Sequence, residues 1–218
     1  MGQALLNING DGVQTLEILF LLTTVSLLPS ILVMMTSFTR IIIVLSFLRN
    51  AMGVQQLPPN IVLIGISLFL TLFIMSPVID SVNQDAYTPY KNQQITQEEA
   101  LKRAQVPLKE FMLKQTEINT LNMYAEFAGE KVPENLQELP MKIVVPSFMT
   151  SELKRAFVIG FLLFIPFMLL DMIVASTLMS MGMMMLPPAM ISLPFKILLF
   201  ITIDGWNLLF STLIKGFN

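Results

Sequence analysis

The chain has 218 residues, of which 54% are hydrophobic and only 13% charged. Soluble domains carry about 25% charged residues, so lipid or protein partners must cover much of this apolar surface. The net charge of −2 gives no basic excess that would indicate nucleic-acid binding. The absence of Cys and His removes thiol chemistry, the commonest general base and the commonest metal ligand. The composition therefore predicts a membrane protein that is not an enzyme and needs no metal or cofactor.

The first residues, Met1-Gly2-Gln3, have no basic region and no short apolar core with a cleavage site. Two explanations stay open at this point. Either the native chain lacks a secretory signal, or a signal has been removed and replaced by Met1.

Four long apolar stretches dominate the pattern. They are Ile18 to Thr39, Asn50 to Ile79 with its apolar core from Ile61, Ala156 to Leu178, and Met190 to Ile214. About 20 apolar residues at roughly 1.5 Å each match a hydrocarbon core of roughly 30 Å, and none of the stretches alternates as barrel strands do. We therefore expect an all-α, multi-segment membrane protein, with about four long apolar helices in hairpins and a small helical extramembrane domain.

The segment from Arg40 to Asn60 is less regular than the stretches around it. Ile41 to Leu48 is apolar but lies between Arg40 and Arg49, and eight residues are too few to span a bilayer. It is either the end of the first helix or a re-entrant or inter-subunit packing segment. Pro58-Pro59 closes the segment and begins the next helix.

Residues 80–150 differ sharply in composition, since they hold seven of the 13 Lys and Arg residues. We expect three parts: residues 1–79 as an N-terminal apolar helix pair, 80–150 as an extramembrane helical segment, and 151–218 as a C-terminal apolar helix pair. Arg40 and Arg49 place the first loop in the cytoplasm by the positive-inside rule, and residues 80–150 then lie on the non-cytoplasmic side. Lys154 and Arg155 argue for the opposite orientation.

Within the polar part, Thr96 and Glu99 form a capping box for a helix expected to end near Gln105. Pro107 is expected in the first turn of another helix. The apolar face of that helix is Leu108, Phe111, Met112 and Gln115. Met123, Tyr124 and Phe127 continue the helical pattern, with Gly129 as a C-cap. Pro133, Pro140 and Pro146 are expected to break the chain on its way back to the membrane.

Asp171 and Lys196 are the most informative charges, because each lies inside an apolar stretch. A charge there costs a few kcal/mol, about 2.5–3.5 at a helix centre, unless it is paired or lines water. A buried pair within or between subunits is one interpretation, and separate snorkelling to the interface is another. Glu152 is expected at the start of the third long helix, where it either complements the helix dipole or contacts a partner. Asp204, before Gly205-Trp206, is expected at the membrane interface.

The segment Met179 to Pro188 is rich in Met, with Gly182 and Pro187-Pro188 as helix breakers. Methionine side chains are flexible and fill irregular gaps, so they often serve in a core. A loop at membrane depth must instead be buried in protein or line a cavity, so copies of it arranged in a ring would close a pore. A weak copper(I) site made only of thioethers is a third possibility.

Two long stretches are similar to one known family. The first runs Thr36-Ser-Phe-Thr-Arg40 through Phe47-Leu-Arg-Asn50 to Pro58-Pro-Asn60. The second runs from Pro146 to Arg155, through Asp171 and Met-Gly-Met-Met-Met-Leu-Pro-Pro188, to Leu193-Pro-Phe-Lys196 and Asp204-Gly-Trp206. Both resemble the FliP family of flagellar type III export-gate subunits, whose virulence relative is SctR. The resemblance covers about residues 15–215.

This resemblance implies a core subunit of the flagellar protein export gate. Several copies, about five, would assemble with FliQ and FliR and with the FlhA/FlhB export apparatus in the bacterial inner membrane at the flagellar basal body, and unfolded flagellar subunits would pass through. It implies a deformable gasket at Met183, Met184 and Met185, and inter-subunit charge contacts at Asp171, Lys196 and Glu152. It also implies a cone of kinked hairpins lying largely outside the hydrocarbon plane. Many members carry a cleavable signal, which puts the native start of this chain in question. The alternatives are a virulence secretion subunit and a Met-lined copper or small-solute transporter.

Overall fold

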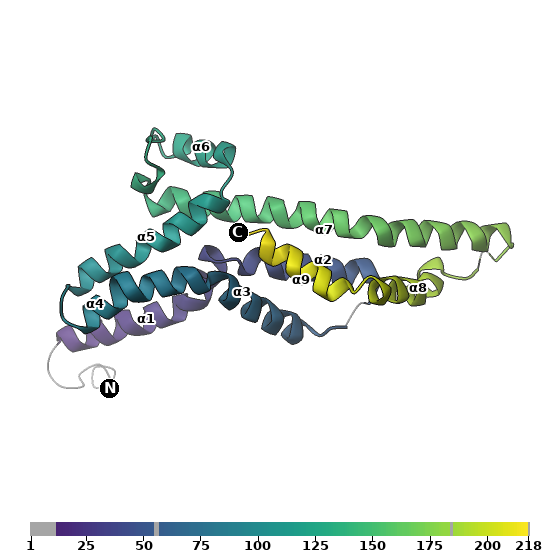
Figure 1. The fold of residues 1–218 in the computed structure, drawn as a ribbon, viewed down its shortest axis with the longest axis horizontal. Coiled ribbons are helices and arrows are strands. Elements are labelled where there is room, and N and C mark those ends of the chain that lie inside the picture. Colours follow the sequence, from purple (N-terminus) through teal and green to yellow (C-terminus); the bar gives the residue numbers. More distant parts are fainter. Residues whose placement is uncertain (1–11, 55–56, 184, 218) are drawn as a thin grey trace, which may run out of the picture. The chain divides into compact units, whose positions relative to one another are not determined.

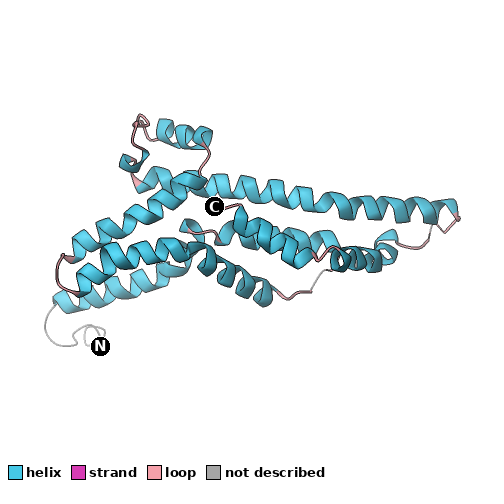
Figure 2. Cartoon of the chain, viewed as in Figure 1, coloured by secondary structure: helices cyan, strands magenta, loops and turns pink. Residues whose placement is uncertain are grey.

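A computed structural model describes residues 12–54, 57–183 and 185–217. It divides into two compact units, one up to Met34 and one from Met35 onward. The described residues form helices and contain no strand, so the predicted all-α class is confirmed (Figures 1 and 2). The helices are α1 (Gly12–Met35), α2 (Phe38–Met52), α3 (Asn60–Val82), α4 (Thr88–Lys91), α5 (Gln97–Gln115), α6 (Ile118–Phe127), α7 (Met141–Ser180), α8 (Pro188–Thr202) and α9 (Gly205–Lys215).

Two continuous helices of the described chain are long and apolar enough to cross a membrane. One is the 32-residue run Asn60–Lys91, in which α3 continues through a π-helical segment (Asn83–Tyr87) into α4, and the other is the 40-residue α7. α8 and α9 pass the same test together but are bent by 62°. A shorter apolar helix, Ile18–Ile31, lies within α1. The predicted multi-segment membrane protein is confirmed.

The fourth apolar stretch is broken where a single long helix was expected. Asp204 adopts a left-handed conformation with φ of 51° between α8 and α9. At Gly205 an added Cβ would lie 2.2 Å from the ring of Phe200, so the absence of a side chain lets this ring pack closely against the backbone beside the break. Hydropathy reports composition and is insensitive to one residue with positive φ, which explains why the break was missed.

The segment between Arg40 and Arg49 forms α2, the most completely buried helix. Ile41, Val44 and Leu45 expose almost no surface, and α2 packs against both α7 and α3. α1 ends at Met35 and a two-residue break precedes α2, so the interpretation as the end of the first helix is wrong. Eight apolar residues suit a short core helix, and here α2 packs within its own chain.

α5 begins as predicted but continues further. The Thr96 side chain accepts a hydrogen bond from the Glu99 N–H at 3.3 Å, which confirms the cap. The expected end near Gln105 is wrong, since Pro107 lies inside a helix that reaches Gln115. Burial of Phe111 in the second half stabilises that half against α7, so tertiary packing overrides the cost of an interior proline.

The predicted face of α5, with Phe111, Met112 and Gln115, is buried. On α6 the predicted stripe is wrong in part, because Phe127 is exposed and the buried residues are Leu121 and Ala125. Gly129 follows the C-cap with φ of 68°, as expected for a helix end.

α7 begins at Met141, directly after Pro140, and continues through Pro146, which was expected to break the chain. Pro146 is past the free N–H groups of the first turn and removes one backbone bond of α7, so the burial of Ile143, Val144 and Phe148 around it must offset that cost. α7 therefore runs across position 150, and the helix Asn60–Lys91 runs across position 80. The division into 1–79, 80–150 and 151–218 describes composition and stays a prediction.

Candidate functional site

The Met-rich loop joins α7 to α8. Gly182 has φ of 74°, and its N–H donates to the Met179 carbonyl at 3.0 Å, while the Met183 N–H donates to the Leu178 carbonyl at 3.0 Å. This pair of bonds is a Schellman motif, which ends a helix with glycine in the left-handed region. Pro188 then occupies the first turn of α8, where its missing N–H costs nothing.

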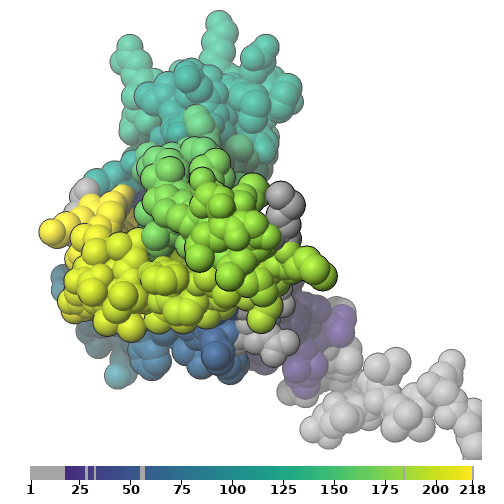
Figure 3. Space-filling model, turned by 90° about the vertical axis from the view of Figure 1, so that its right-hand side faces the viewer, coloured from purple at the N-terminus to yellow at the C-terminus, as the bar shows by residue number. Residues whose placement is uncertain are grey.

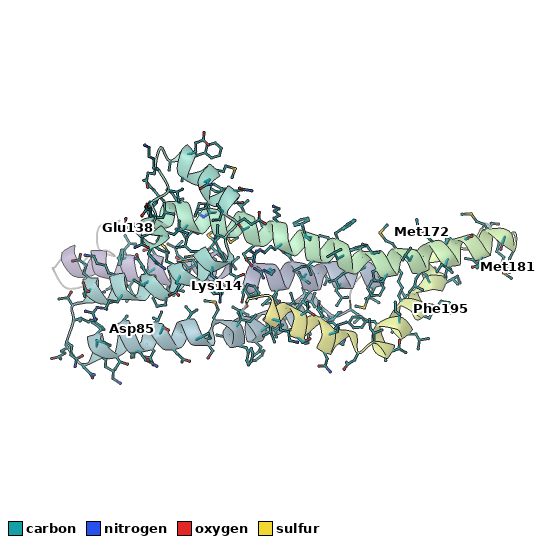
Figure 4. All side chains as sticks on the ribbon, turned by 45° about the horizontal axis from the view of Figure 1, so that its top comes forward. Asp85, Lys114, Glu138, Met172, Met181 and Phe195 are labelled. Carbon is teal, nitrogen blue, oxygen red and sulfur yellow. The ribbon has the colours of Figure 1, made fainter. Side chains whose placement is uncertain are left out.

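The described methionine side chains of this loop lie on the surface of the single chain. Met185 is 97% exposed and Met183 is 44% exposed, while Met184 lies outside the described residues. Figure 4 shows Met181 at the far end of the α7–α8 hairpin, with Phe195 further back along α8. Figure 3 looks onto this end, where the hairpin side chains (green to yellow) form the surface. Thioether side chains so exposed are not core filler within this chain.

Asp171 and Lys196 form an ion pair between α7 and α8. Lys196 Nζ lies 2.7 Å from Asp171 Oδ2, and the hydroxyl of buried Ser192 donates to Asp171 Oδ1 at 2.5 Å. The two charges do pair, but within one chain and not across a subunit boundary, where we had expected the pair. Contacts of Asp171 and Lys196 with neighbouring subunits stay a prediction. The Lys196 side chain is 7% exposed and that of Asp171 39% exposed, so only the carboxylate has surface available to a neighbouring molecule.

Lys196 also reaches α2. Its Nζ donates to the carbonyl of Ala51 at 3.2 Å, in the last turn of α2, where carbonyls lack intrahelical partners. A cation at a helix C-terminus is stabilised by the helix dipole. Gly53, with φ of 78°, follows α2 and would place an added Cβ 4.0 Å from Lys196 Nζ. One ammonium group thus ties the hairpin that carries the Met-rich loop to the buried helix α2.

Glu152 belongs to a different cluster. It lies within α7 rather than at a helix start, and it pairs with Arg40 of α2, so the helix-dipole interpretation is wrong. Arg40 Nε donates to Glu152 Oε2 at 2.8 Å and Arg40 Nη2 donates to Glu152 Oε1. The side chains are 3% and 0% exposed. The Glu152 carboxylate is enclosed by its own chain, and an inter-subunit contact of Glu152 itself has no support in this geometry.

Arg40 was not predicted as the partner of Glu152, although its position in the sequence carries a signal of burial. Arg40 lies on the same helical face as Val44 and Leu48, at spacings of four and eight residues, and all three are buried. Glu152 likewise stands between buried Phe148 and Ala156 on α7. A charge in register with an apolar stripe indicates burial, and two such charges of opposite sign indicate a pair.

The chain as a whole is similar to known proteins of one family. The sequence profile of the FliP family matches residues 21–213. The flagellar biosynthetic protein FliP of Bacillus subtilis (strain 168) is 53% identical over 203 residues, which is 93% of this chain and 92% of the relative. The FliP of Pectobacterium carotovorum subsp. carotovorum is 51% identical over 211 residues, 96% and 82% of the two chains. That of Aquifex aeolicus (strain VF5) is 49% identical over 213 residues, 96% and 88%.

Proposed function

The chain belongs to the FliP family of flagellar biosynthetic proteins, and from this we propose that it is a core subunit of the flagellar type III protein export gate. It is a membrane-embedded component of the flagellar export apparatus and not an enzyme. In the proposed role, several copies, about five, assemble with FliQ and FliR, and with FlhA and FlhB, into the channel through which unfolded flagellar subunits cross the inner membrane. The flagellar names of the relatives favour this branch over virulence secretion.

The observation that carries the proposal is the exposed Met-rich loop at the end of a long hairpin. Met185 exposes nearly its whole side chain, and Met183 a large part. Apolar groups so exposed need a cover other than water. A ring of copies would bring Met183, Met184 and Met185 of each chain together. Such a ring seals by dispersion contacts, yet it yields to an unfolded chain because methionine changes rotamer at little cost.

The rigid attachment of the loop supports a gating role. The Schellman motif fixes the end of α7, and the Asp171–Lys196 pair ties α7 to α8 nearby in the hairpin. The partly exposed carboxylate of Asp171 is the charge that we propose contacts a neighbouring subunit. Flexible side chains on a fixed backbone suit a seal that must close again after each passage.

The test replaces Met183, Met184 and Met185 together with Ala. The variant should assemble at normal yield, since the loop is outside the packed core, but the membrane should become leaky to ions or small solutes. The matched control is Met172→Ala, because Met172 is an exposed methionine of α7 away from the loop. Complex yield is read by co-purification and leak by dye or ion flux. If the triple variant assembles fully, lets no ions or small solutes through and exports at the normal rate, these three residues do not form the gate.

A further inference from the structure

Residues that follow α9 lie in a polar site formed by three helices from distant parts of the chain. The Gly216 carbonyl accepts a hydrogen bond from Arg40 Nη1 at 3.1 Å, and the Phe217 carbonyl accepts one from Gln115 Nε2 at 3.0 Å. Arg40 comes from α2 and Gln115 from the end of α5. Phe217 itself is buried. This segment is therefore held by its backbone as well as by its side chain.

The ring of Phe217 makes two further contacts in the same site. The guanidinium carbon of Arg40 lies 3.7 Å from the ring centroid, which is a cation–π arrangement. The ring is also stacked on Phe111 of α5, with centroids 6.1 Å apart and planes inclined by 17°. One aromatic side chain thus contacts both the buried cation of α2 and the apolar face of α5.

Gln115 links this segment to the buried ion pair. Its Oε1 accepts from Arg40 Nη2 at 3.1 Å and from Arg155 Nη1 at 3.0 Å, while its Nε2 donates to Phe217. Both the oxygen and the nitrogen of the Gln115 amide are therefore hydrogen-bonded. If Gly216 and Phe217 left the site, a guanidinium N–H and an amide N–H would lose their acceptors in a buried setting, which is unfavourable.

We propose that Gly216 and Phe217 act as a latch, which completes the Arg40–Gln115–Glu152 cluster and thereby holds α5 against α2 and α7. Every other member of the cluster precedes these two residues in the sequence, so the ribosome makes them before the latch. The cluster is complete only after α9 has been synthesised and packed.

The test measures two regions of the purified full-length chain in detergent micelles. Trypsin cleavage after Lys215, followed by intact mass, reports release of the segment beyond α9, and hydrogen exchange reports the order of α5. Phe217→Ala should accelerate cleavage at least tenfold and also raise exchange in the second half of α5. Phe217→Leu keeps an apolar side chain but loses the ring, and it should show both effects at smaller size.

The matched control is Phe210→Ala, which removes a partly buried ring of α9 from the other apolar cluster. It should leave exchange in α5 within twofold of the unsubstituted chain, even where it lowers the melting temperature as much as a Phe217 variant does. The latch is overturned if Phe217→Ala and Phe217→Leu speed cleavage but leave α5 unchanged. It is equally overturned if the control gives the same pattern as the Phe217 variants. The measurements use isolated chains, so they stand apart from export and from the role of the Met-rich loop.

Discussion

Arg40 and Glu152 stand 112 positions apart in the sequence, yet their side chains pair through two hydrogen bonds in a site closed to solvent. The pair connects α2 with α7, which pack against each other. A buried ion pair is retained only when both charges are satisfied, because each ion alone would carry its full desolvation cost.

Removing one charge of this pair should lower the free energy of unfolding far more than removing both. Arg40→Met alone or Glu152→Leu alone leaves a buried unpaired charge and should lower the free energy of unfolding by about 3–5 kcal/mol. The double variant should recover much of that loss, though Gly216 still loses its donor. Thermal unfolding of the purified chain measures all three. If the double variant is as unstable as the two single losses combined, the charges are not coupled.

Exchanging the charges of Asp171 and Lys196 should allow only partial assembly of the complex. Asp171→Lys or Lys196→Asp alone places two like charges together and should abolish assembly. Both changes together should restore some assembled complex, but less than normal, because Ser192 and the Ala51 carbonyl are suited to the original arrangement. Co-purification yield is the measurement.

The control for this exchange is the exposed pair Glu98 and Lys102 on α5. Exchanging these two charges should leave the yield unchanged, because exposed ion pairs contribute at most about 1 kcal/mol. An Asp171–Lys196 double exchange that assembles no better than either single change would argue against the pair.

Gly160 should be intolerant of even one added carbon. A Cβ at this position of α7 would lie 2.5 Å from the ring of Phe47 on α2, so Gly160→Ala should cost about 1–3 kcal/mol through overpacking. Gly65→Ala on α3 is the matched control, since no atom lies within 4 Å of its added Cβ. That change should be neutral or should stabilise by about 0.4–1 kcal/mol. Equal melting temperatures for the two variants would show that the helices can separate freely at Gly160.

Residues 80–150 are proposed to lie on the non-cytoplasmic side. Asn92→Cys introduces the sole cysteine of the chain at an exposed position after α4. It should react with a membrane-impermeant maleimide in cells whose outer membrane has been permeabilised. Leu57→Cys, in the exposed loop before α3, is the control and should react only after the inner membrane is opened. The reverse pattern of labelling would invert the proposed orientation.

Local sequence patterns predicted much of this chain because the physics behind them is local. The capping residue Thr96 and the helix breakers Gly182 and Pro188 act within one turn, so the sequence alone placed the start of α5 and the ends of the Met-rich loop. The charges Asp171 and Lys196 were predicted to pair because an apolar stretch offers a charge few other partners.

Only the tertiary structure decided which distant groups meet. No local sequence pattern selects Glu152 as the partner of Arg40 or Gln115 as the partner of Phe217. Both contacts depend on how α2, α5, α7 and α9 pack together. The continuation of α5 through Pro107 is likewise settled by long-range packing, which outweighs a local cost of about 3 kcal/mol for an interior proline. Composition determined that this chain is a helical membrane protein, while its buried polar connections follow from side-chain packing across its full length.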